Sequence, residues 1–328
     1  ITGGAGSIGS EIIRQLINFK PSEILIIDNS ETPMFDLKSE LSSFEEEINF
    51  HFVVDSILDK DSMSYLFKKF KPDVVFHAAA FKHVSMMEEN PKTAIINNIL
   101  GTKNLIEVSL NASISKFVFI SSDKAVNPSS VMGVTKRICE LYISKFFNHI
   151  PDIVVTRFGN VLGSNGSVVK IFKDQISSGG PVTVTHPDVN RYFMTIPEAS
   201  QLVLEAGAMG EKGEIFVFDM GEPVKISDLA KKMIKLSGKI IDEDIAIEYI
   251  GLRPGEKLYE ELLTDNEKLK KSYNSLILIA EKDFVDDNTY NAIDELIELA
   301  KKGSDNITLI DKMKEIVEEY KPLNSIYS

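Results

Sequence analysis

The sequence predicts an α/β protein in which a doubly wound parallel sheet is followed by a smaller C-terminal domain. Apolar runs of strand length alternate with segments of helical period through the first half of the chain. The chain also opens on a glycine-rich segment that leads directly into a helical pattern. Alternating strands and helices build a parallel sheet that helices cover on both faces. Together the two features indicate a Rossmann-type fold.

The opening segment has the glycine spacing of a phosphate-binding loop. Three glycines are arranged as GxxGxxG, and the helical pattern Glu11–Leu16 follows them. Such glycines let the backbone turn tightly and approach a pyrophosphate, whose charge then lies at a helix N-terminus. A glycine-rich turn before an ordinary helix is the plainer alternative. On the first interpretation the dinucleotide contacts Gly3, Gly6, Ser7, Ile8 and Gly9.

The next apolar run favours the dinucleotide. Glu23–Asp28 has the composition of a buried parallel strand and ends in an acid about 20 residues after the loop, as dinucleotide folds require. Asp28 is therefore the candidate for the adenosine ribose hydroxyls, with a solvated acid at a strand end as the alternative. A carboxylate there accepts hydrogen bonds from free hydroxyls but repels a 2′-phosphate. We predict NAD rather than NADP.

The start of the chain leaves little room for the first strand of this fold. A Rossmann unit needs a strand before its glycines, and Ile1 and Thr2 can supply only its end. Since no initiator Met is present, we expect the chain to be a fragment of a longer protein. It contains no signal-peptide pattern and no apolar run of about 18 residues, so we expect this piece to be soluble.

The composition limits the classes of partner and cofactor. With 328 residues, 43% of them hydrophobic, the chain can form one large domain or two interlocked ones. Its single cysteine, Cys139, excludes an internal disulfide and a cysteine metal cluster and is consistent with a reducing compartment. The net charge of −13 argues against a nucleic-acid partner. An anionic substrate must therefore be bound by local basic residues.

We predict an NAD-binding domain over residues 1–160 and a mostly substrate-binding domain over residues 161–328. The later region has longer loops rich in Gly, Pro and Asn, then helices such as Ile226–Ser237. The apolar run Glu214–Asp219 is expected to return to the first sheet, and Asp311–Tyr320 to form an amphipathic helix without chemistry. The remaining strands of the first domain are predicted at Phe50–Val54, Val74–Phe76, Phe117–Ser121 and Ile153–Arg157.

Polar residues that can carry chemistry follow the predicted strand Phe117–Ser121. Ser122, Asp123 and Lys124 come directly after it, and ligands of open parallel sheets bind beyond the carboxyl ends of the strands. Met132 and Lys136 are spaced i and i+4, so they lie one turn apart on one face of the next helix. We expect this cluster to face the cofactor.

Further segments along nearly the whole chain carry a family pattern. They are the glycine loop, Asp55, His77–Ala80, Asn98–Thr102, Ser122–Lys124, Arg157–Val161, His186–Asp188, Arg191–Met194 and Arg253–Lys257. Together they resemble the extended short-chain dehydrogenases/reductases, specifically the nucleotide-sugar 4,6-dehydratases of bacterial polysaccharide and glycan biosynthesis. The closest resemblance is to the catalytic domain of the membrane-anchored UDP-N-acetylglucosamine 4,6-dehydratases.

The resemblance implies a reaction and its partners. NAD⁺ takes a hydride from C4 of a UDP-linked hexose, water leaves across C5 and C6, and the hydride returns to C6. It also implies a homo-oligomer in polysaccharide biosynthesis or protein glycosylation, with a cytoplasmic catalytic domain and an inner-membrane anchor in the missing N-terminal region. Further cofactor contacts are implied for Asp55, Ser56, Ala78, Ala79, Asn98 and Lys136.

Met132 departs from the general pattern of short-chain dehydrogenases. These enzymes usually carry Tyr-x-x-x-Lys, whose tyrosine takes the proton from the hydroxyl being oxidised, and a thioether cannot accept that proton. The membrane-anchored subgroup resembles this chain in carrying methionine there, which favours retention of configuration at C5. The C4 proton is then expected to leave through Asp123 or a water held by Ser122 and Lys136. Lys136 is also expected to hydrogen-bond the nicotinamide ribose.

Asp123 and Lys124 fit the elimination step, as the resemblance also implies. To protonate the leaving C6 hydroxyl, Asp123 needs a pKa above the usual value of about 3.9, and to take the C5 proton Lys124 needs one below about 10.4. Burial or a neighbouring charge such as Lys136 can supply these shifts. An ion pair would stabilise the opposite protonation states, so substrate binding must separate or reorganise the pair. A solvated loop ion pair is the alternative.

Basic residues are the candidates for holding the substrate. Arg191 and Arg253 are expected to bind its diphosphate because forked guanidinium groups suit phosphate oxygens. Arg253 could instead pair with Glu256, and His83 could be an ordinary structural residue. His77 is expected to be structural, because the histidines lack metal-ligand spacing. The expected substrate contacts are Lys82, His83, Asn160, Arg191, Arg253 and Glu256.

Four rival functions remain open at this stage. A UDP-hexose 4-epimerase normally needs the missing tyrosine, and a 4-keto reductase would consume NADPH, contrary to Asp28. A C5-inverting dehydratase shares the scaffold. A non-catalytic NAD-binding regulatory module is favoured by Met132 alone. Substitution of Asp123 or Lys124 distinguishes the enzyme from the module, because only the enzyme would lose turnover with NAD binding intact.

Overall fold

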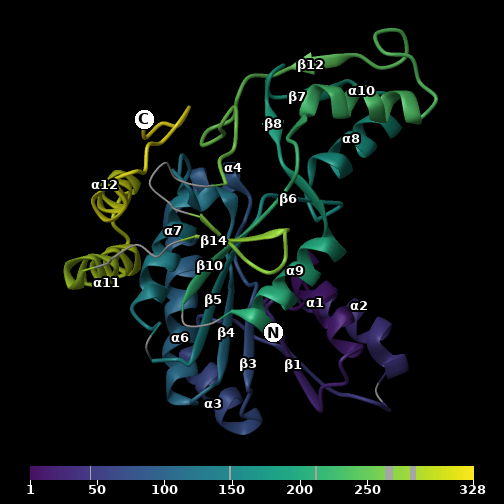
Figure 1. The fold of residues 1–328 in the computed structure, drawn as a ribbon. Coiled ribbons are helices and arrows are strands. Elements are labelled where there is room, and N and C mark those ends of the chain that lie inside the picture. Colours follow the sequence, from purple (N-terminus) through teal and green to yellow (C-terminus); the bar gives the residue numbers. More distant parts are fainter. Residues whose placement is uncertain (45, 148, 211–212, 263–268, 281–285) are drawn as a thin grey trace.

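The computed structural model describes residues 1–328 except 45, 148, 211–212, 263–268 and 281–285. A body of strands and helices carries a smaller upper lobe (Figure 1). The strands of the body are β1 (Glu23–Asp28), β2 (Asn49–Val54), β3 (Val74–His77), β4 (Lys116–Ile120), β5 (Asp152–Arg157), β10 (Glu214–Phe218), β13 (Leu269–Lys271) and β14 (Ile277–Ala280).

Six of these strands form one sheet, in the order β13-β14-β10-β5-β4-β3, and β1 and β2 form a parallel pair beside it. The strands β3, β4, β5 and β10 run parallel, whereas β14 is antiparallel to β10. Thr2 forms parallel bridges to both Ile27 and His77, so the chain enters the glycine loop between β1 and β3. The predicted Rossmann-type sheet is confirmed, and the strands named from the sequence match to within one residue.

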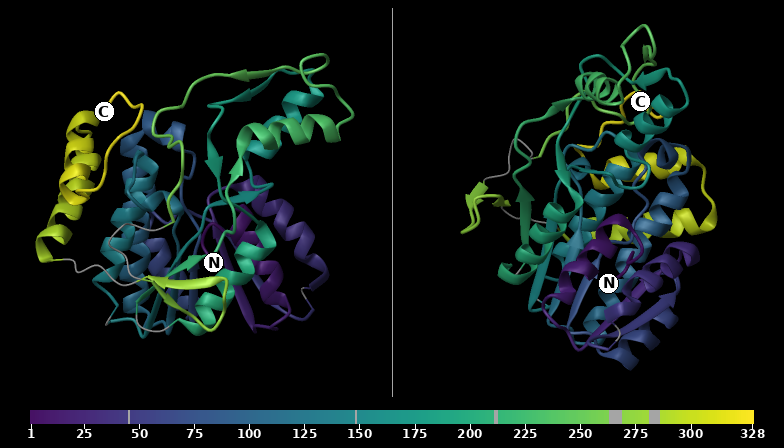
Figure 2. Two further views of the ribbon diagram at one scale, coloured as in Figure 1. Left: turned by 45° about the horizontal axis from the view of Figure 1, so that its top comes forward. Right: turned by 90° about the vertical axis from the view of Figure 1, so that its right-hand side faces the viewer.

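Helices cover both faces of the sheet, as the right-hand view of Figure 2 also shows. On one face α1 packs against α9, and on the other lie α3, α6 and α7, with α11 and α12 packed outside η2, α5 and α7. Because α7 lies between the sheet and this outer pair, all its residues from Val131 to Ile143 are buried. The helices of the body are α1 (Ser7–Ile17), α2 (Glu31–Leu41), α3 (Lys60–Phe70), α4 (Val84–Glu89), α5 (Pro91–Ala94), α6 (Gly101–Asn111), α7 (Val131–Ser144), α9 (Ile196–Met209), α11 (Asp287–Lys302) and α12 (Asn306–Ile316), with the shorter η1 (Ser42–Phe44), η2 (Ile95–Leu100) and η3 (Asp123–Ala125).

The C-terminal helix is displaced from its predicted position. The sequence suggested Asp311–Tyr320, whereas α12 begins at Asn306 and ends at Ile316. Asp305 caps it by accepting a hydrogen bond from the backbone of Thr308, at 3.1 Å, which fixes the start of the helix before the amphipathic run. Residues 317–320 lie outside the helix and begin the C-terminal tail.

The upper lobe is built from short pairs of strands and two helices around its own small core. Phe172, Val182 and Ile234 lie at the centre of that core. In this region β11 pairs with β8, β12 with β7 and β6 with β9. The division of the chain into two domains near residue 160 stays a prediction. The elements are β6 (Asn160–Leu162), β7 (Val182–Val184), β8 (Asn190–Arg191), β9 (Phe193–Thr195), β11 (Val224–Lys225), β12 (Ile247–Tyr249), α8 (Val168–Ser177) and α10 (Ile226–Leu236).

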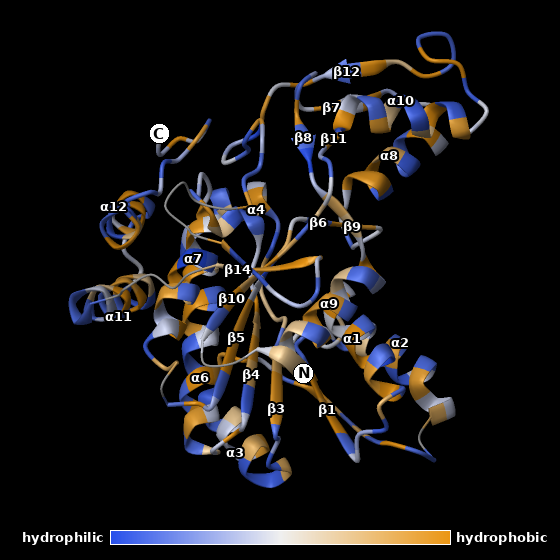
Figure 3. Ribbon diagram, viewed as in Figure 1, coloured by the Kyte–Doolittle hydropathy of each residue, from blue (hydrophilic) through white to orange (hydrophobic). Residues whose placement is uncertain are grey.

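The hydropathy of the chain follows these layers. In Figure 3 the central strands are largely orange, whereas the outer surfaces of α10, α11 and α12 carry many blue residues. Strands covered by helices on both faces are expected to be apolar throughout. Within the described part of the chain, no helix has the length and apolar character needed to cross a bilayer.

Candidate active site

Two adjoining cavities lie at the carboxyl ends of the strands, below the upper lobe. The larger, of about 760 Å³, extends from the glycine loop past β4 to the upper lobe. The smaller, of about 250 Å³, opens beside α4 and the segment around Arg253. Predicted site residues from five separate parts of the chain meet here. Both cavities are lined by Lys82, His83, Lys124, Asn160, Arg191, Arg253 and Glu256.

The glycine loop forms a cradle that side chains would fill. A Cβ atom on Gly9 would lie 2.1 Å from the Gly3 carbonyl oxygen, and one on Gly3 would lie 2.6 Å from the backbone nitrogen of Ala79. Helix α1 begins directly after Gly6, which has no side chain to cap it. Its first N–H groups have no acceptor within the helix. This arrangement fits the pyrophosphate of a dinucleotide.

Asp28 lies in a further cavity, of about 260 Å³, on the other side of the glycine loop. Its carboxylate accepts hydrogen bonds from the backbone N–H groups of Ala5, at 3.1 Å, and Ser30, at 2.9 Å. These two bonds fix the carboxylate at the end of β1, as an adenosine ribose requires. The predicted cofactor contacts Asp55, Ser56, Ala78 and Ala79 line the same cavity.

Asn98 was expected to touch the cofactor, and the structure corrects this. Its side chain is 2% exposed and lines none of the three cavities. The side-chain oxygen accepts from the Phe81 N–H at 2.8 Å, while the amide nitrogen donates to the Phe81 carbonyl at 3.1 Å and to Thr135 Oγ1 at 3.0 Å. Both ends of the amide are occupied, so Asn98 holds the backbone after β3 in place.

Asp123 lies beneath the cavities rather than in them. It is fully buried in the turn η3 that follows β4, and it lines neither active-site cavity. Its Oδ1 accepts from Ser122 Oγ at 2.9 Å and from Lys124 Nζ at 3.0 Å, whereas its Oδ2 has no hydrogen-bond partner. Burial raises the pKa of Asp123, although the charge of Lys124 opposes the shift. The expected direction is therefore present, but direct access to substrate is not.

Lys124 is held between two carboxylates, which corrects the expected lowering of its pKa. Its ammonium lies 3.0 Å from Asp123 and 3.4 Å from Glu260. Burial alone would lower the pKa of Lys124, but the negative charges of Asp123 and Glu260 outweigh this effect and raise it. Lys124 is therefore protonated in this arrangement and must lose a proton before it can act as a base.

Met132 and Lys136 lie side by side on α7 in the wall of the larger cavity. The ammonium of Lys136 donates to the Ile120 carbonyl at 2.8 Å and lies 4.6 Å from the centre of the Phe119 ring. Burial lowers the pKa of Lys136 to about 8. With this pKa Lys136 still carries its proton at neutral pH, so its ammonium can also donate a hydrogen bond to a ribose hydroxyl.

A carboxylate that sequence reasoning missed, Glu260, joins the basic residues. Arg191 lies 2.9 Å from Glu256 and 3.6 Å from Glu260. Glu256 also accepts from the backbone N–H of Arg253 at 3.1 Å, so the predicted Arg253–Glu256 contact runs through the backbone. Two carboxylates thus hold Arg191 and Lys124 in one cluster. The only sequence signal for Glu260 is that several glutamates follow Arg253 within a few residues.

The histidines do not form a metal site in the described part of the chain. His77 is buried, with its two ring nitrogens 2.8 Å from Thr2 Oγ1 and 2.9 Å from Thr102 Oγ1. It therefore joins the glycine loop to α6, in line with a structural role. The His83 ring lies against Gly166, where a Cβ atom would be 2.4 Å from it.

Comparisons with known proteins agree with this geometry. Residues 1–282 match the family described as Polysaccharide biosynthesis protein. The capsular polysaccharide biosynthesis protein CapD of Staphylococcus aureus is 56% identical over 270 residues, which cover 81% of this chain and 45% of that protein. The chain thus spans about half the length of this curated relative.

A second relative matches the chain almost from end to end. The UDP-N-acetylglucosamine 4,6-dehydratase (inverting) of Campylobacter jejuni is 34% identical over 338 residues, covering 97% of this chain and 95% of that enzyme. The X-ray structure of Pen from Bacillus thuringiensis aligns with a TM-score of 0.79 and 33% identity, over 87% of each chain. Structures sharing the fold at 19% and 24% identity include a dTDP-glucose 4,6-dehydratase and a UDP-glucose 4-epimerase with NAD bound.

Proposed function

The chain belongs to the polysaccharide biosynthesis protein family of extended short-chain dehydrogenases/reductases, and from this premise we propose that it acts as an NAD-dependent UDP-N-acetylglucosamine 4,6-dehydratase. The observation that carries the proposal is the position of the Asp123–Lys124 turn. Lys124 lines both the larger and the smaller cavity, and Asp123 lies directly beneath it. An elimination needs an acid and a base where these cavities adjoin, because there the cofactor and the hexose must meet.

The cofactor is NAD, and the residues present fit it. The glycine cradle suits its pyrophosphate, and Asp28 suits a ribose with free hydroxyls. When bound, the nicotinamide supplies the hydride acceptor for C4 and the hydride donor for C6. Lys136 is placed in the same cavity to donate to the nicotinamide ribose.

Ser122, Asp123 and Lys124 move the protons. Ser122 and Lys136 line the cavity, and a water held between them takes the C4 proton. Lys124 becomes neutral by passing its proton to Asp123 and then takes the C5 proton, which the new C4 carbonyl makes acidic. The proton on Asp123 passes through the hydroxyl of Ser122, which contacts Asp123, and leaves with the C6 hydroxyl as water. Lys124 then returns its proton to C5 and regains the proton taken from C4, so the product differs from the substrate by one water.

We propose that this chemistry retains the configuration at C5. One residue, Lys124, removes and returns the proton, and it reaches C5 from one face. The resemblance to methionine-bearing dehydratases, through Met132, supports the same outcome. The Campylobacter jejuni relative is named as inverting, so the opposite configuration is a distinct result of the test below.

The substrate contacts are proposed for the residues of the smaller cavity. Arg191 and Arg253 would hold the diphosphate, with Lys82, His83 and Asn160 nearer to the sugar. Binding must draw Arg191 toward phosphate and away from Glu256, to which it is now paired. The proposal includes the homo-oligomer and the membrane anchor of the full-length protein that the resemblance implies.

Proton NMR of the purified chain with UDP-N-acetylglucosamine and NAD⁺ in deuterated water tests the activity. A new C6 methyl signal with deuterium at C5 is expected, and the ring couplings report whether C5 is retained or inverted. A galacto-configured product would instead identify a 4-epimerase. No change in the sugar with NAD bound would contradict the proposed activity and favour a binding module.

Substitutions separate the chemistry from cofactor binding. Lys124→Met and Asp123→Asn should abolish methyl formation while leaving the affinity for NAD within about twofold, since neither residue lines the Asp28 cavity. Lys270→Met on the distant edge strand β13 is the matched control and should keep full turnover. Turnover that survives both active-site substitutions would remove the roles assigned here.

A further inference from the structure

The C-terminal tail runs behind one wall of the smaller cavity. It leaves α12 on the side of the body that faces the upper lobe, as both views of Figure 2 show in yellow. The Lys321 N–H donates to the Pro128 carbonyl at 3.0 Å, and the Leu323 N–H donates to the Ser129 carbonyl at 3.1 Å. The Leu323 carbonyl accepts from the Gly255 N–H at 2.7 Å. Residues 321–323 therefore join the segment before α7 to the segment after Arg253.

Two side chains of the tail extend this connection. Asn324 donates through Nδ2 to the Glu256 carbonyl at 3.3 Å, and Ser325 donates through Oγ to Glu88 Oε2 at 2.8 Å. Glu88 is 4% exposed, and its other oxygen accepts from the Val131 N–H at 2.5 Å, at the first residue of α7. The tail thus contacts the Arg253–Glu256 segment directly and the start of α7 through the buried carboxylate of Glu88. These two segments are walls of the smaller cavity.

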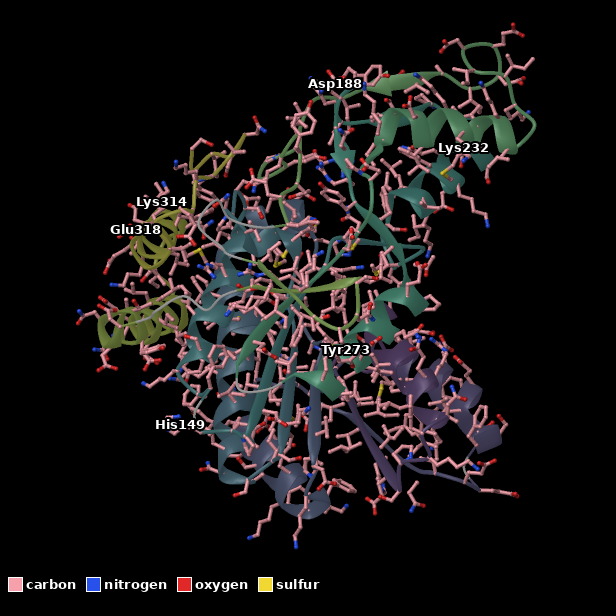
Figure 4. The ribbon with its side chains drawn as sticks, viewed as in Figure 1. His149, Asp188, Lys232, Tyr273, Lys314 and Glu318 are labelled. Atoms are coloured by element: carbon pink, nitrogen blue, oxygen red, sulfur yellow. The ribbon has the colours of Figure 1, made fainter. Side chains whose placement is uncertain are left out.

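The end of the tail is itself anchored. Tyr327 is 8% exposed and donates to the Glu88 carbonyl at 3.3 Å. Lys314, labelled on α12 in Figure 4, donates to the Tyr327 carbonyl at 3.1 Å. The match to the polysaccharide biosynthesis family model ends at residue 282, so this anchored segment lies outside the residues that the model matches.

The Arg253–Glu256 segment and the start of α7 pack closely together where the tail contacts them. Gly255 has a φ of +77°, and a Cβ atom there would lie 2.7 Å from the Ser130 Cβ and 2.9 Å from Glu88 Oε1. The Ser129 hydroxyl also donates to the Gly255 carbonyl at 2.9 Å. Arg253 and Glu256 flank this contact and face the cavity, so the position of Gly255 sets the position of both side chains.

We propose that residues 321–325 are a positioning element for the diphosphate subsite. They hold the Arg253–Glu256 segment against Ser129 and Ser130 and so fix the distance between the Arg253 side chain and the rest of the cavity. This inference rests on the proposed function, because it assumes that a nucleoside diphosphate occupies that cavity. It predicts an effect on substrate binding rather than on the chemical step, since no residue of the tail lines the cavity.

The test is the double variant Asn324→Gly with Ser325→Ala. Glycine is chosen because Asn324 has a φ of +52°, which alanine tolerates poorly. Loss of the Asn324–Glu256 and Ser325–Glu88 hydrogen bonds should raise the dissociation constant for UDP, measured by calorimetry, and the KM for the UDP-sugar about tenfold. The affinity for NAD and the kcat should stay within about twofold. Ser325→Thr keeps the hydroxyl and should restore part of the affinity in the Asn324→Gly background.

Ile326→Ala is the matched control in the tail. Ile326 is 88% exposed, so its truncation should leave UDP binding unchanged. An unchanged UDP affinity in the double variant, or a loss of kcat at constant KM, would overturn the positioning role while leaving the proposed function intact. Wild-type protein that binds no UDP and turns over no UDP-sugar would overturn both. Equal melting curves for variant and control exclude general unfolding as the cause.

Discussion

Helix α7 packs so closely on the Asp123–Lys124 turn that one added methyl group should disturb the chemistry. In the first turn of α7, a Cβ atom on Gly133 would lie 2.2 Å from the Lys124 carbonyl oxygen and 3.1 Å from Ser130 Oγ. Ordinary contact begins near 3.4 Å, so Gly133→Ala must separate helix and turn by about 1.2 Å. A backbone carbonyl cannot rotate away as a flexible side chain can.

The expected cost falls on rate more than on stability. Overpacking of this kind costs about 1–3 kcal/mol, and the better helix propensity of alanine offsets about 1 kcal/mol of it. The melting temperature should therefore fall by only a few degrees, at about 2–4 °C per kcal/mol. A displacement of about 1 Å at a reacting group can lower the rate about 100-fold. We expect kcat/KM for methyl formation to fall by about that factor.

The assay compares Gly133→Ala with Gly207→Ala, a glycine-to-alanine change in another helix. A Cβ atom on Gly207 in α9 would meet its nearest atom, Val118 Cγ2, at 3.2 Å, and Gly207 lines none of the three cavities of the candidate site. Turnover by NMR and thermal unfolding by circular dichroism are measured for both. Gly133→Ala activity within threefold of the wild type would refute the reasoning. So would an equal loss in Gly207→Ala.

Three further predictions concern charge. Lys136→Met should raise stability at pH 7 by about 3 kcal/mol relative to wild type, because the folded pKa of about 8 lies below the usual 10.5. The stability difference should shrink between pH 8 and pH 10.5, because there Lys136 binds fewer protons in the folded protein than in the unfolded chain. Chemical denaturation across that pH range measures the difference, and Lys232→Met, at an exposed position (Figure 4), is the control. Glu260→Gln should lower the pKa of Lys124 and move the rise of kcat/KM with pH to lower pH, whereas neighbouring Glu261→Gln should not. Asp28→Ser should weaken NAD binding about tenfold by calorimetry and admit NADP, and a variant that still excludes NADP would contradict its assigned role.

Local sequence signals predicted the parts of this site that depend on local geometry. The glycine loop, the strand ending at Asp28 and the turn after β4 were all placed correctly, because glycine spacing and strand period determine them within a few residues. The direction of a side chain was not predictable in the same way. Asn98 lies in a recognised segment, but whether its amide faces the cavity or the Phe81 backbone depends on how α7 packs against η2.

Contacts between distant segments were the other part that the sequence could not supply. Glu260 reaches Lys124 from a distant part of the sequence, and together with Asp123 it reverses the expected direction of the pKa of Lys124. The C-terminal tail that follows α12 likewise contacts Gly255 and Glu88, which are distant from it in the sequence. Such contacts depend on how the upper lobe and the C-terminal helices fold back on the sheet, and no spacing within one segment records that.

The ion pair between Lys124 and Asp123 does not have to break for both residues to reach their working states. Their atoms are 3.0 Å apart, and one proton passing from Nζ to Oδ1 gives a neutral amine and a neutral acid together. Burial favours that change because it removes two charges from a region poor in water. Asp123 is already fully buried, and the Lys124 side chain is 17% exposed toward the cavity. A hexose that covers Lys124 removes its remaining water, so substrate binding itself drives the pair toward the forms that elimination requires.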